Sequence, residues 1–268
     1  AVKSLLQQNK DLQITVLSRS FFGPIFQGQE RLFFYGADLK AKHKGLKGLL
    51  KLASELHQQS KFDAVVDLHG LLRSRIITGY FRTKGVKTAT FEKGRAEKNI
   101  MLKTHNLRQL PHATQRYLKV FSQFKLKNEL LEGPYYQTQQ VKEAVAILEK
   151  HKLLGPINLI GIAPFAQHAS KEWPLPKVRL LIAELTQNPK NRIVLFGGGA
   201  IEASKLATIE DENPRCVSLA GKYPLGVELN VIGRLKVMVS MDSANMHLAT
   251  LCGTPVVSIW GPTHHYLG

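Results

Sequence analysis

The chain has little of what secreted and membrane-spanning proteins depend on. Its 268 residues include two cysteines, Cys216 and Cys252, which are too few for a disulfide framework. Both stand in apolar surroundings, so we expect two small core residues in a reducing compartment. No apolar run approaches the roughly 20 residues that cross a bilayer, and the first residues show a polar helical pattern instead of a signal peptide. We therefore expect a soluble chain with enough residues for two cores.

Familiar metal and nucleotide motifs are missing as well. There is no Asp-x-Asp pair and no His, Cys and carboxylate cluster at metal-ligand spacing, so we expect no metal and no other cofactor. Gly197-Gly198-Gly199 follows an apolar run, but Glu202 stands where a dinucleotide fingerprint needs its last glycine. The run therefore predicts close approach of a ligand to the backbone, without identifying that ligand.

Acidic residues are scarce in the first half of the chain. Residues 1–136 hold 24 Lys+Arg against 10 Asp+Glu, whereas residues 137–268 hold 13 against 10. The resulting excess of +14 attracts anions, which include nucleic acid, anionic lipid and phosphorylated glycolipid. A basic nucleic-acid-binding protein remains one interpretation, but no helix-turn-helix, RNP or zinc-finger pattern supports it, and few aromatic residues are available to stack bases.

Short apolar runs alternate with helical periods through both halves of the chain. Residues 62–68 predict a buried strand that leads through Gly70 into a helix, and residues 157–163, 192–196, 235–239 and 256–260 predict further strands. A break at Glu132-Gly133-Pro134 separates the halves. This pattern predicts an α/β protein with two Rossmann-like domains, at 1–136 and 137–268, built on open parallel sheets that face each other across a cleft.

The most informative stretch runs from Ser240 to Gly261. An apolar run precedes Asp242 and Ser243, which fall where the N-cap of the next helix belongs, so free backbone N–H groups would meet an anion there. Taken alone, the pattern is also explained without any ligand, by an Asp242 that caps the helix and a His247 that lies in the core. The order Asp242-Ser243-Ala244, His247, Gly253-Thr254-Pro255 and Gly261-Pro262-Thr263 resembles the donor-site signature of the family that includes the ADP-heptose:lipopolysaccharide heptosyltransferases, glycosyltransferase family 9.

The resemblance implies a GT-B fold and assigns roles to residues in both halves. In the first half, the family's basic segment after Asp67 meets the anionic acceptor, which implies acceptor contacts from Arg73 and Arg75. In the second half, the Ser-Lys-x-Trp-Pro run places Ser170 and Lys171 on the donor pyrophosphate, and the Gly-rich turn receives the nucleotide. The donor-binding residues that the resemblance implies are Ser170, Lys171, Gly198, Glu202, Asp242, Ser243, Ala244 and His247.

The family's reaction moves a heptose from ADP-heptose to an anionic lipopolysaccharide core acceptor. We expect displacement with inversion and without a metal, because cationic side chains and helix N-termini replace the divalent ion at the leaving diphosphate. The resemblance also implies a cytoplasmic enzyme in peripheral contact with the inner membrane, with no nucleic-acid partner. A nucleotide-sugar epimerase of similar two-domain build is the closest alternative, and it would need no acceptor.

Parts of the family pattern have no counterpart in these residues. The chain opens on a helical pattern, and no Gly-Asp pair occurs, although in the family a Gly-Asp segment after the first strand holds the proposed catalytic base. Gly268 follows soon after Gly-Pro-Thr, before the expected closing helices. The N-terminal strand and the C-terminal helices are therefore expected to be missing. The catalytic residue remains unknown, with a general base expected upstream of Ala1.

Overall fold

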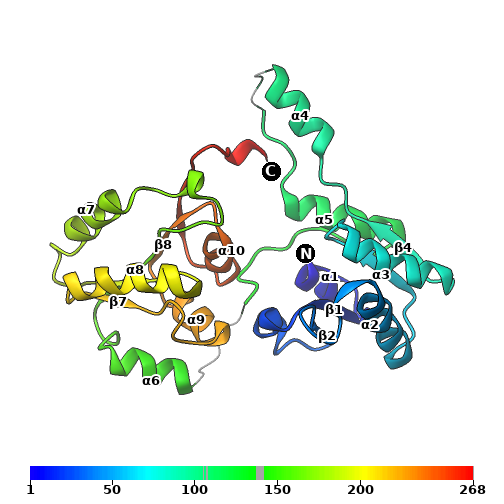
Figure 1. The fold of residues 1–268 in the computed structure, drawn as a ribbon, viewed down its shortest axis with the longest axis horizontal. Helices are drawn as coiled ribbons and strands as arrows, with labels where there is room; N and C mark the ends of the chain where they lie inside the picture. The colour runs from blue at the N-terminus through cyan, green and yellow to red at the C-terminus, as the bar shows by residue number, and fades with distance from the viewer. Residues whose placement is uncertain (105, 107, 137–141, 268) are drawn as a thin grey trace. The chain divides into compact units, whose positions relative to one another are not determined.

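A computed structural model describes residues 1–104, 106, 108–136 and 142–267 as two compact units (Figure 1). The first unit comprises Ala1–Leu131 together with the end of the chain from Tyr266, and the second comprises Glu132–His265. The predicted boundary at residue 136 directly precedes residues 137–141, which lie outside the described residues. Among the described residues, no helix combines the length and the apolar character that spanning a bilayer requires.

The first unit alternates short strands with helices. Its elements are α1 (Val2–Gln8), β1 (Ile14–Arg19), the 3₁₀ helix η1 (Ser20–Phe26), β2 (Leu32–Ala37), α2 (Gly45–Gln59), β3 (Ala64–Asp67), α3 (Leu72–Thr83), β4 (Lys87–Thr90), α4 (Arg95–Thr104), α5 (Ala113–Phe121) and η2 (Ser122–Phe124). The strand predicted over residues 62–68 is shorter, and most of it is half-buried instead of buried. Its described neighbours leave one edge uncovered, which explains the difference.

The strands of the first unit form two separate parallel pairs instead of one open sheet. β1 pairs with β2, from Ile14 beside Leu32 to Arg19 beside Ala37, and β3 pairs with β4. The described residues of this unit thus hold their parallel strands as two pairs. One core cluster of α2 and α3 side chains includes Leu17 of β1 and Val65 of β3, and another includes Ile14 and Val66. Helices thus connect the two pairs on both faces.

The second unit contains one five-stranded parallel sheet in the order β7-β6-β5-β8-β9. Its elements are α6 (Lys142–Lys150), β5 (Asn158–Ala163), η3 (Ala169–Lys171), α7 (Leu175–Leu185), β6 (Asn191–Leu195), α8 (Gly199–Glu212), β7 (Cys216–Ser218), α9 (Leu225–Ile232), β8 (Val237–Met241), α10 (Ala244–Leu251), β9 (Val256–Ile259) and η4 (His265–Leu267), whose last two residues lie with the first unit. The chain moves outward from β5 to β7, then returns to β8 on the other side of β5. This reversal is the doubly wound arrangement, with its switch point between β5 and β8.

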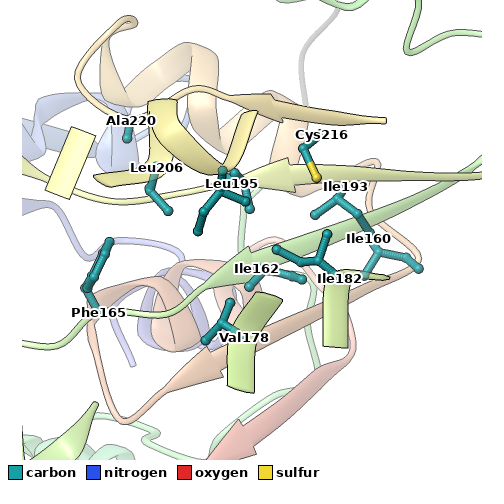
Figure 2. Packing of buried hydrophobic residues seen from close by; sticks show 11 residues of the cluster. Ile160, Ile162, Phe165, Val178, Ile182, Ile193, Leu195, Leu206, Cys216 and Ala220 are labelled. Atoms are coloured by element: carbon teal, nitrogen blue, oxygen red, sulfur yellow. The ribbon is translucent and has the colours of Figure 1, made fainter. Parts of the chain in front are cut away.

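The strands of the second unit form because their apolar side chains are buried in its core. Their residues are almost continuously apolar, as expected where helices cover both faces of a parallel sheet. Figure 2 shows Ile162 and Leu195 of adjacent strands packed with Val178 of α7 and Leu206 of α8. On the opposite face, Gly161 lets Leu235 approach the strand closely: a Cβ there would lie 2.5 Å from the Leu235 side chain, which would have to shift. Cys216 and Cys252 are both buried and free, as predicted.

Candidate functional site

The strongest candidate site lies at the switch point of the five-stranded sheet. β5 and β8 are parallel neighbours, with Ala163 beside Ser240 in register, so the segments that follow them leave the sheet at the same edge. The segment after β5 contains η3, and the segment after β8 contains Asp242 and leads into α10. Ligands of open α/β sheets bind at this place because the loops diverge there and leave a crevice.

Lys171 and Asp242 form an ion pair at this edge. The Lys171 Nζ donates to Asp242 Oδ2 at 2.6 Å, although 71 residues separate the two in sequence. The side chains are 22% and 18% exposed, so water screens the pair only partly. The fold therefore brings together two of the residues predicted to bind the donor.

Two further contacts hold the loop after β5 against β8. The backbone N–H of Trp173 donates to the Sδ of Met241 at 3.3 Å, and Glu172 Oε1 accepts from the backbone N–H of Ala166 at 3.2 Å. The first contact joins the loop to the strand that precedes Asp242. The second closes the loop on itself, so Lys171 projects from a supported segment. A supported cation loses less side-chain entropy when it binds an anion.

The Gly-Pro-Thr segment after β9 completes the cluster. Thr263 donates its hydroxyl to Asp242 Oδ2 at 2.9 Å, so this one oxygen accepts from two side chains. Gly261 packs against the segment of η3, and a Cβ there would lie 2.7 Å from the carbonyl oxygen of Ser170. Thr263 was not among the predicted site residues, although it belongs to the motif that carries the family resemblance. Its motif position was the available signal.

The electrostatics of Asp242 reflect these neighbours. Partial burial alone would raise the pKa of the Asp242 carboxyl, but hydrogen bonds from Lys171 and Thr263 together with the charges of Lys171 and His247 outweigh it, and the pKa is lowered. Asp242 is therefore a carboxylate at neutral pH. Its ionised form neutralises Lys171 in this structure.

The N-terminus of α10 differs in detail from the prediction. Ser243 is the N-cap and Ala244 the first helical residue, but the Ser243 side chain makes no capping hydrogen bond. Its hydroxyl lies 3.2 Å from that of Ser240 instead. Asp242 precedes the cap, so its predicted capping position is wrong: the carboxylate turns toward Lys171 and Thr263. His247 is exposed, which rules out the interpretation as a core histidine.

The predicted nucleotide residues after β6 form a pair of their own. Gly198 is the N-cap of α8, and its backbone N–H donates to Glu202 Oε2 at 2.7 Å. The carboxylate thus turns back on the helix N-terminus, where it interacts favourably with the helix dipole. β6 neighbours β5 in the sheet, so this turn lies at the same edge as the Lys171 loop. Ser170, which directly precedes Lys171 in η3, is exposed.

Arg73 and Arg75 lie in the first unit, in the first turn of α3. Both side chains are exposed. The turn before them is built by Asp67, which is buried and whose Oδ1 accepts from the backbone N–H groups of His69 at 2.9 Å and Gly70 at 2.8 Å. Gly70 has a φ of +61°, a conformation that glycine adopts without strain. The arginines thus leave a fixed turn at the carboxyl end of β3.

Comparisons with known proteins agree with this architecture. The profile of glycosyltransferase family 9 (heptosyltransferase) matches residues 49–267. Lipooligosaccharide heptosyltransferase 2 of Haemophilus influenzae is 30% identical over 138 residues, which cover 48% of this chain and 40% of that protein. The chain thus matches about two fifths of the length of this curated relative.

Two solved structures share the fold. A glycosyl transferase family 9 protein from Veillonella parvula superposes with a TM-score of 0.76 at 19% identity, covering 98% of this chain and 76% of the other. The E. coli heptosyltransferase WaaC with ADP gives a TM-score of 0.73 at 19% identity, covering 99% and 83%. These likenesses confirm the predicted α/β fold of the GT-B type.

Proposed function

Because the chain belongs to glycosyltransferase family 9, we propose that it acts in the transfer of a heptose from a nucleotide-diphosphate donor to an anionic lipopolysaccharide core. The curated relatives are named as heptosyltransferases of lipopolysaccharide or lipooligosaccharide, and one structural neighbour holds ADP. These names support the reaction class and the donor class for this chain. An ADP-heptose is the donor that they favour.

The observation that carries the proposal is the Lys171–Asp242 pair at the switch point. In our proposal the donor diphosphate replaces the carboxylate as the partner of Lys171, since a doubly charged diphosphate attracts the ammonium more strongly. Asp242 then accepts a hydroxyl of the ribose or sugar, and Thr263 continues to orient it. The remaining proposed neighbours of the nucleotide and sugar lie in segments at the same edge of the sheet: Ser170, Gly198, Glu202, Ser243, Ala244 and His247.

The chemistry that follows is displacement at the anomeric carbon with inversion. An acceptor hydroxyl attacks from the side opposite the diphosphate, and charge builds up on the departing phosphate oxygen. Lys171 and the backbone N–H groups at the start of α10 stabilise that charge, so a protein cation takes the role of a divalent ion. The attack also needs a general base to take the proton of the acceptor hydroxyl, and the proposal assigns that role to no residue of this chain.

Arg73 and Arg75 are the proposed contacts of the acceptor. Guanidinium groups bind phosphate and carboxylate in a bidentate manner, and both groups are abundant on an anionic glycolipid core. The positive excess of residues 1–136 would draw such an acceptor in, on the cytoplasmic side of a membrane where the enzyme binds peripherally. Replacing both arginines is expected to raise the KM for the acceptor and to leave donor affinity unchanged.

Calorimetry with Lys171→Ala tests the donor assignment. We expect the affinity for ADP to fall about 10–100-fold, because a charge-assisted contact to phosphate is lost, while adenosine affinity changes little. Lys177→Ala removes an exposed lysine six residues away and serves as the matched control. Equal losses for ADP and adenosine would contradict the assignment.

Turnover of the donor separates transfer from the epimerase alternative. A transferase releases nucleotide diphosphate in proportion to the glycolipid acceptor supplied, whereas an epimerase changes the donor without any acceptor. Donor turnover that does not depend on acceptor would overturn the proposed reaction and leave the donor site in place.

A further inference from the structure

The N-terminal halves of α2 and α3 form a surface that lies outside the donor site. The two helices pack against each other and share a core cluster through Leu52, Ala53 and Phe81. Away from this cluster, α2 exposes Leu46, with 60% of its surface accessible. α3 exposes Leu72, with 76% accessible. Exposed leucines at the start of two adjacent helices require an explanation that packing does not supply.

A hollow of about 490 Å³ lies between these leucines. It is lined by Leu46 and Leu72 together with the residues Leu39, His43, Gly45, Leu49, Arg73 and Ile76. Five of its side chains are aliphatic, so its surface favours hydrocarbon over water. Arg73 adds one cation at its rim. We name the lining residues together with Lys44 and Lys47 the α2–α3 face.

Basic residues predominate around this hollow, although Asp38 directly precedes Leu39 and Glu55 lies 3.1 Å from His43 of the lining. From residue 39 to residue 54 the sequence contains five lysines and neither Asp nor Glu, and from residue 68 to residue 91 it again contains basic residues without an acidic one. Lys44, Lys47 and Arg75 are exposed and enter no ion pair within the described part of the chain. Lys42 differs, because it pairs with Glu55 at 3.0 Å and stabilises α2 internally.

We infer that the α2–α3 face is a docking surface for an anionic phospholipid bilayer. Leu46 and Leu72 enter the interface between headgroups and acyl chains, while Lys44 and Lys47 neutralise the anionic headgroups around them. Apolar residues ringed by lysines and arginines are the pattern of proteins that lie on a membrane, and an apolar or a basic signal alone binds weakly. The inference assigns a surface to the membrane contact of the proposed function. Binding of the bilayer by this face does not depend on the transfer reaction, but its use to the enzyme rests on the proposed function.

The occupant follows from combining the two features. Nucleic acid would account for the cations but not for an aliphatic hollow, since bases stack on exposed aromatic rings and the ring in this face, that of His43, is buried. A protein partner would account for the leucines, but not for the marked excess of cations around them. A bilayer with anionic lipids satisfies both at once.

Co-sedimentation with vesicles tests the inference without donor or acceptor, so its outcome is independent of the transfer reaction. The full chain is mixed with vesicles of neutral phosphatidylcholine alone or with phosphatidylglycerol added. We expect binding to the mixed vesicles only, and weaker binding as salt rises, because counterions screen the headgroups. Equal binding to neutral vesicles, or binding to an oligonucleotide and not to vesicles, would overturn the inference.

Variants assign the binding to this face. Lys44→Gln with Lys47→Gln is expected to weaken vesicle binding about 25-fold, from about fivefold for each lysine near an anionic surface. Leu46→Ser with Leu72→Ser is expected to weaken it several-fold. All four side chains are exposed, so the fold is not at risk. The matched control on another helix is Lys177→Gln with Leu180→Ser, also exposed. Equal binding by the control and the face variants would place the contact elsewhere.

Discussion

The two units use similar strands with different results. In the second unit β5 has a neighbour on each side, and five of its six residues are buried. In the first unit β1 and β3 each pair with one strand in the described residues, and their residues are mostly half-buried. The sequence of β3, Ala-Val-Val-Asp, is nevertheless mostly apolar. Burial of a strand therefore depends on the number of its neighbours as well as on its composition.

The same contrast extends to the sites. A sheet with a central strand has a switch point, where loops from two neighbouring strands converge, and the Lys171–Asp242 pair forms there. The first unit instead presents charges on helix surfaces, where Lys44, Lys47, Arg73 and Arg75 are exposed. A site where several loops converge favours a small ligand, whereas a charged helical surface favours an extended anionic partner.

The largest expected effect comes from shortening an isoleucine in each sheet. Ile193 of β6 is fully buried, so Ile193→Ala should lower the free energy of unfolding of the second unit by about 3–4 kcal/mol through lost burial and a residual cavity. Ile14→Ala in β1 should cost about 1–2 kcal/mol, because this side chain is already partly in water. Chemical denaturation followed by circular dichroism measures both. Equal losses would remove the contrast in strand burial.

A half-buried carboxyl on α9 gives the second effect. Burial raises the pKa of Glu228 to about 7. The folded chain therefore holds a proton that the unfolded chain releases, and stability falls as pH rises from about 4.5 to about 7. Glu228→Gln should raise stability at pH 8 by about 1–3 kcal/mol and remove this fall. Denaturation at pH 5 and pH 8 measures it, and an unchanged pH dependence would contradict the assignment.

Glu55 of α2 gives the opposite dependence in the first unit. Hydrogen bonds from Lys42 and Tyr35 lower the pKa of its carboxyl to about 2. Its contribution to stability is present above the unfolded value near 4.5 and disappears as pH falls toward about 2. Glu55→Gln should thus destabilise the first unit at pH 7 and make no difference at the acid end. A difference that persists unchanged at low pH would show that Glu55 acts through packing instead of charge.

The smallest effect concerns the two thiols, both in the second unit. Burial raises the pKa of Cys216 and of Cys252 to about 12, so neither is a thiolate at neutral pH. Labelling with a disulfide reagent should therefore be slow in the native chain and accelerate in parallel with unfolding of the second unit. Rapid labelling under native conditions would show that this unit opens locally more easily than its burial implies.

The sequence alone was sufficient for the fold class and for most elements. Apolar runs and helical periods predicted the helices α1, α3 and α10 and the strands β5, β6, β8 and β9, because both signals depend on neighbouring residues along the chain. The family signature identified Lys171, Asp242 and His247 without any knowledge of distance. Local pattern and motif therefore determined which residues to consider.

Only the tertiary structure decided how those residues meet. Lys171 and Asp242 were predicted separately, as a phosphate cation and a hydroxyl acceptor, and their pairing depends on β5 and β8 being neighbours in the sheet. Thr263 joins them for the same reason. Likewise, the separation of β1 and β3, and the exposure of Leu46 beside Leu72, follow from which elements pack together. Strand order and helix packing are set by contacts distant in sequence, which local periodicity does not record.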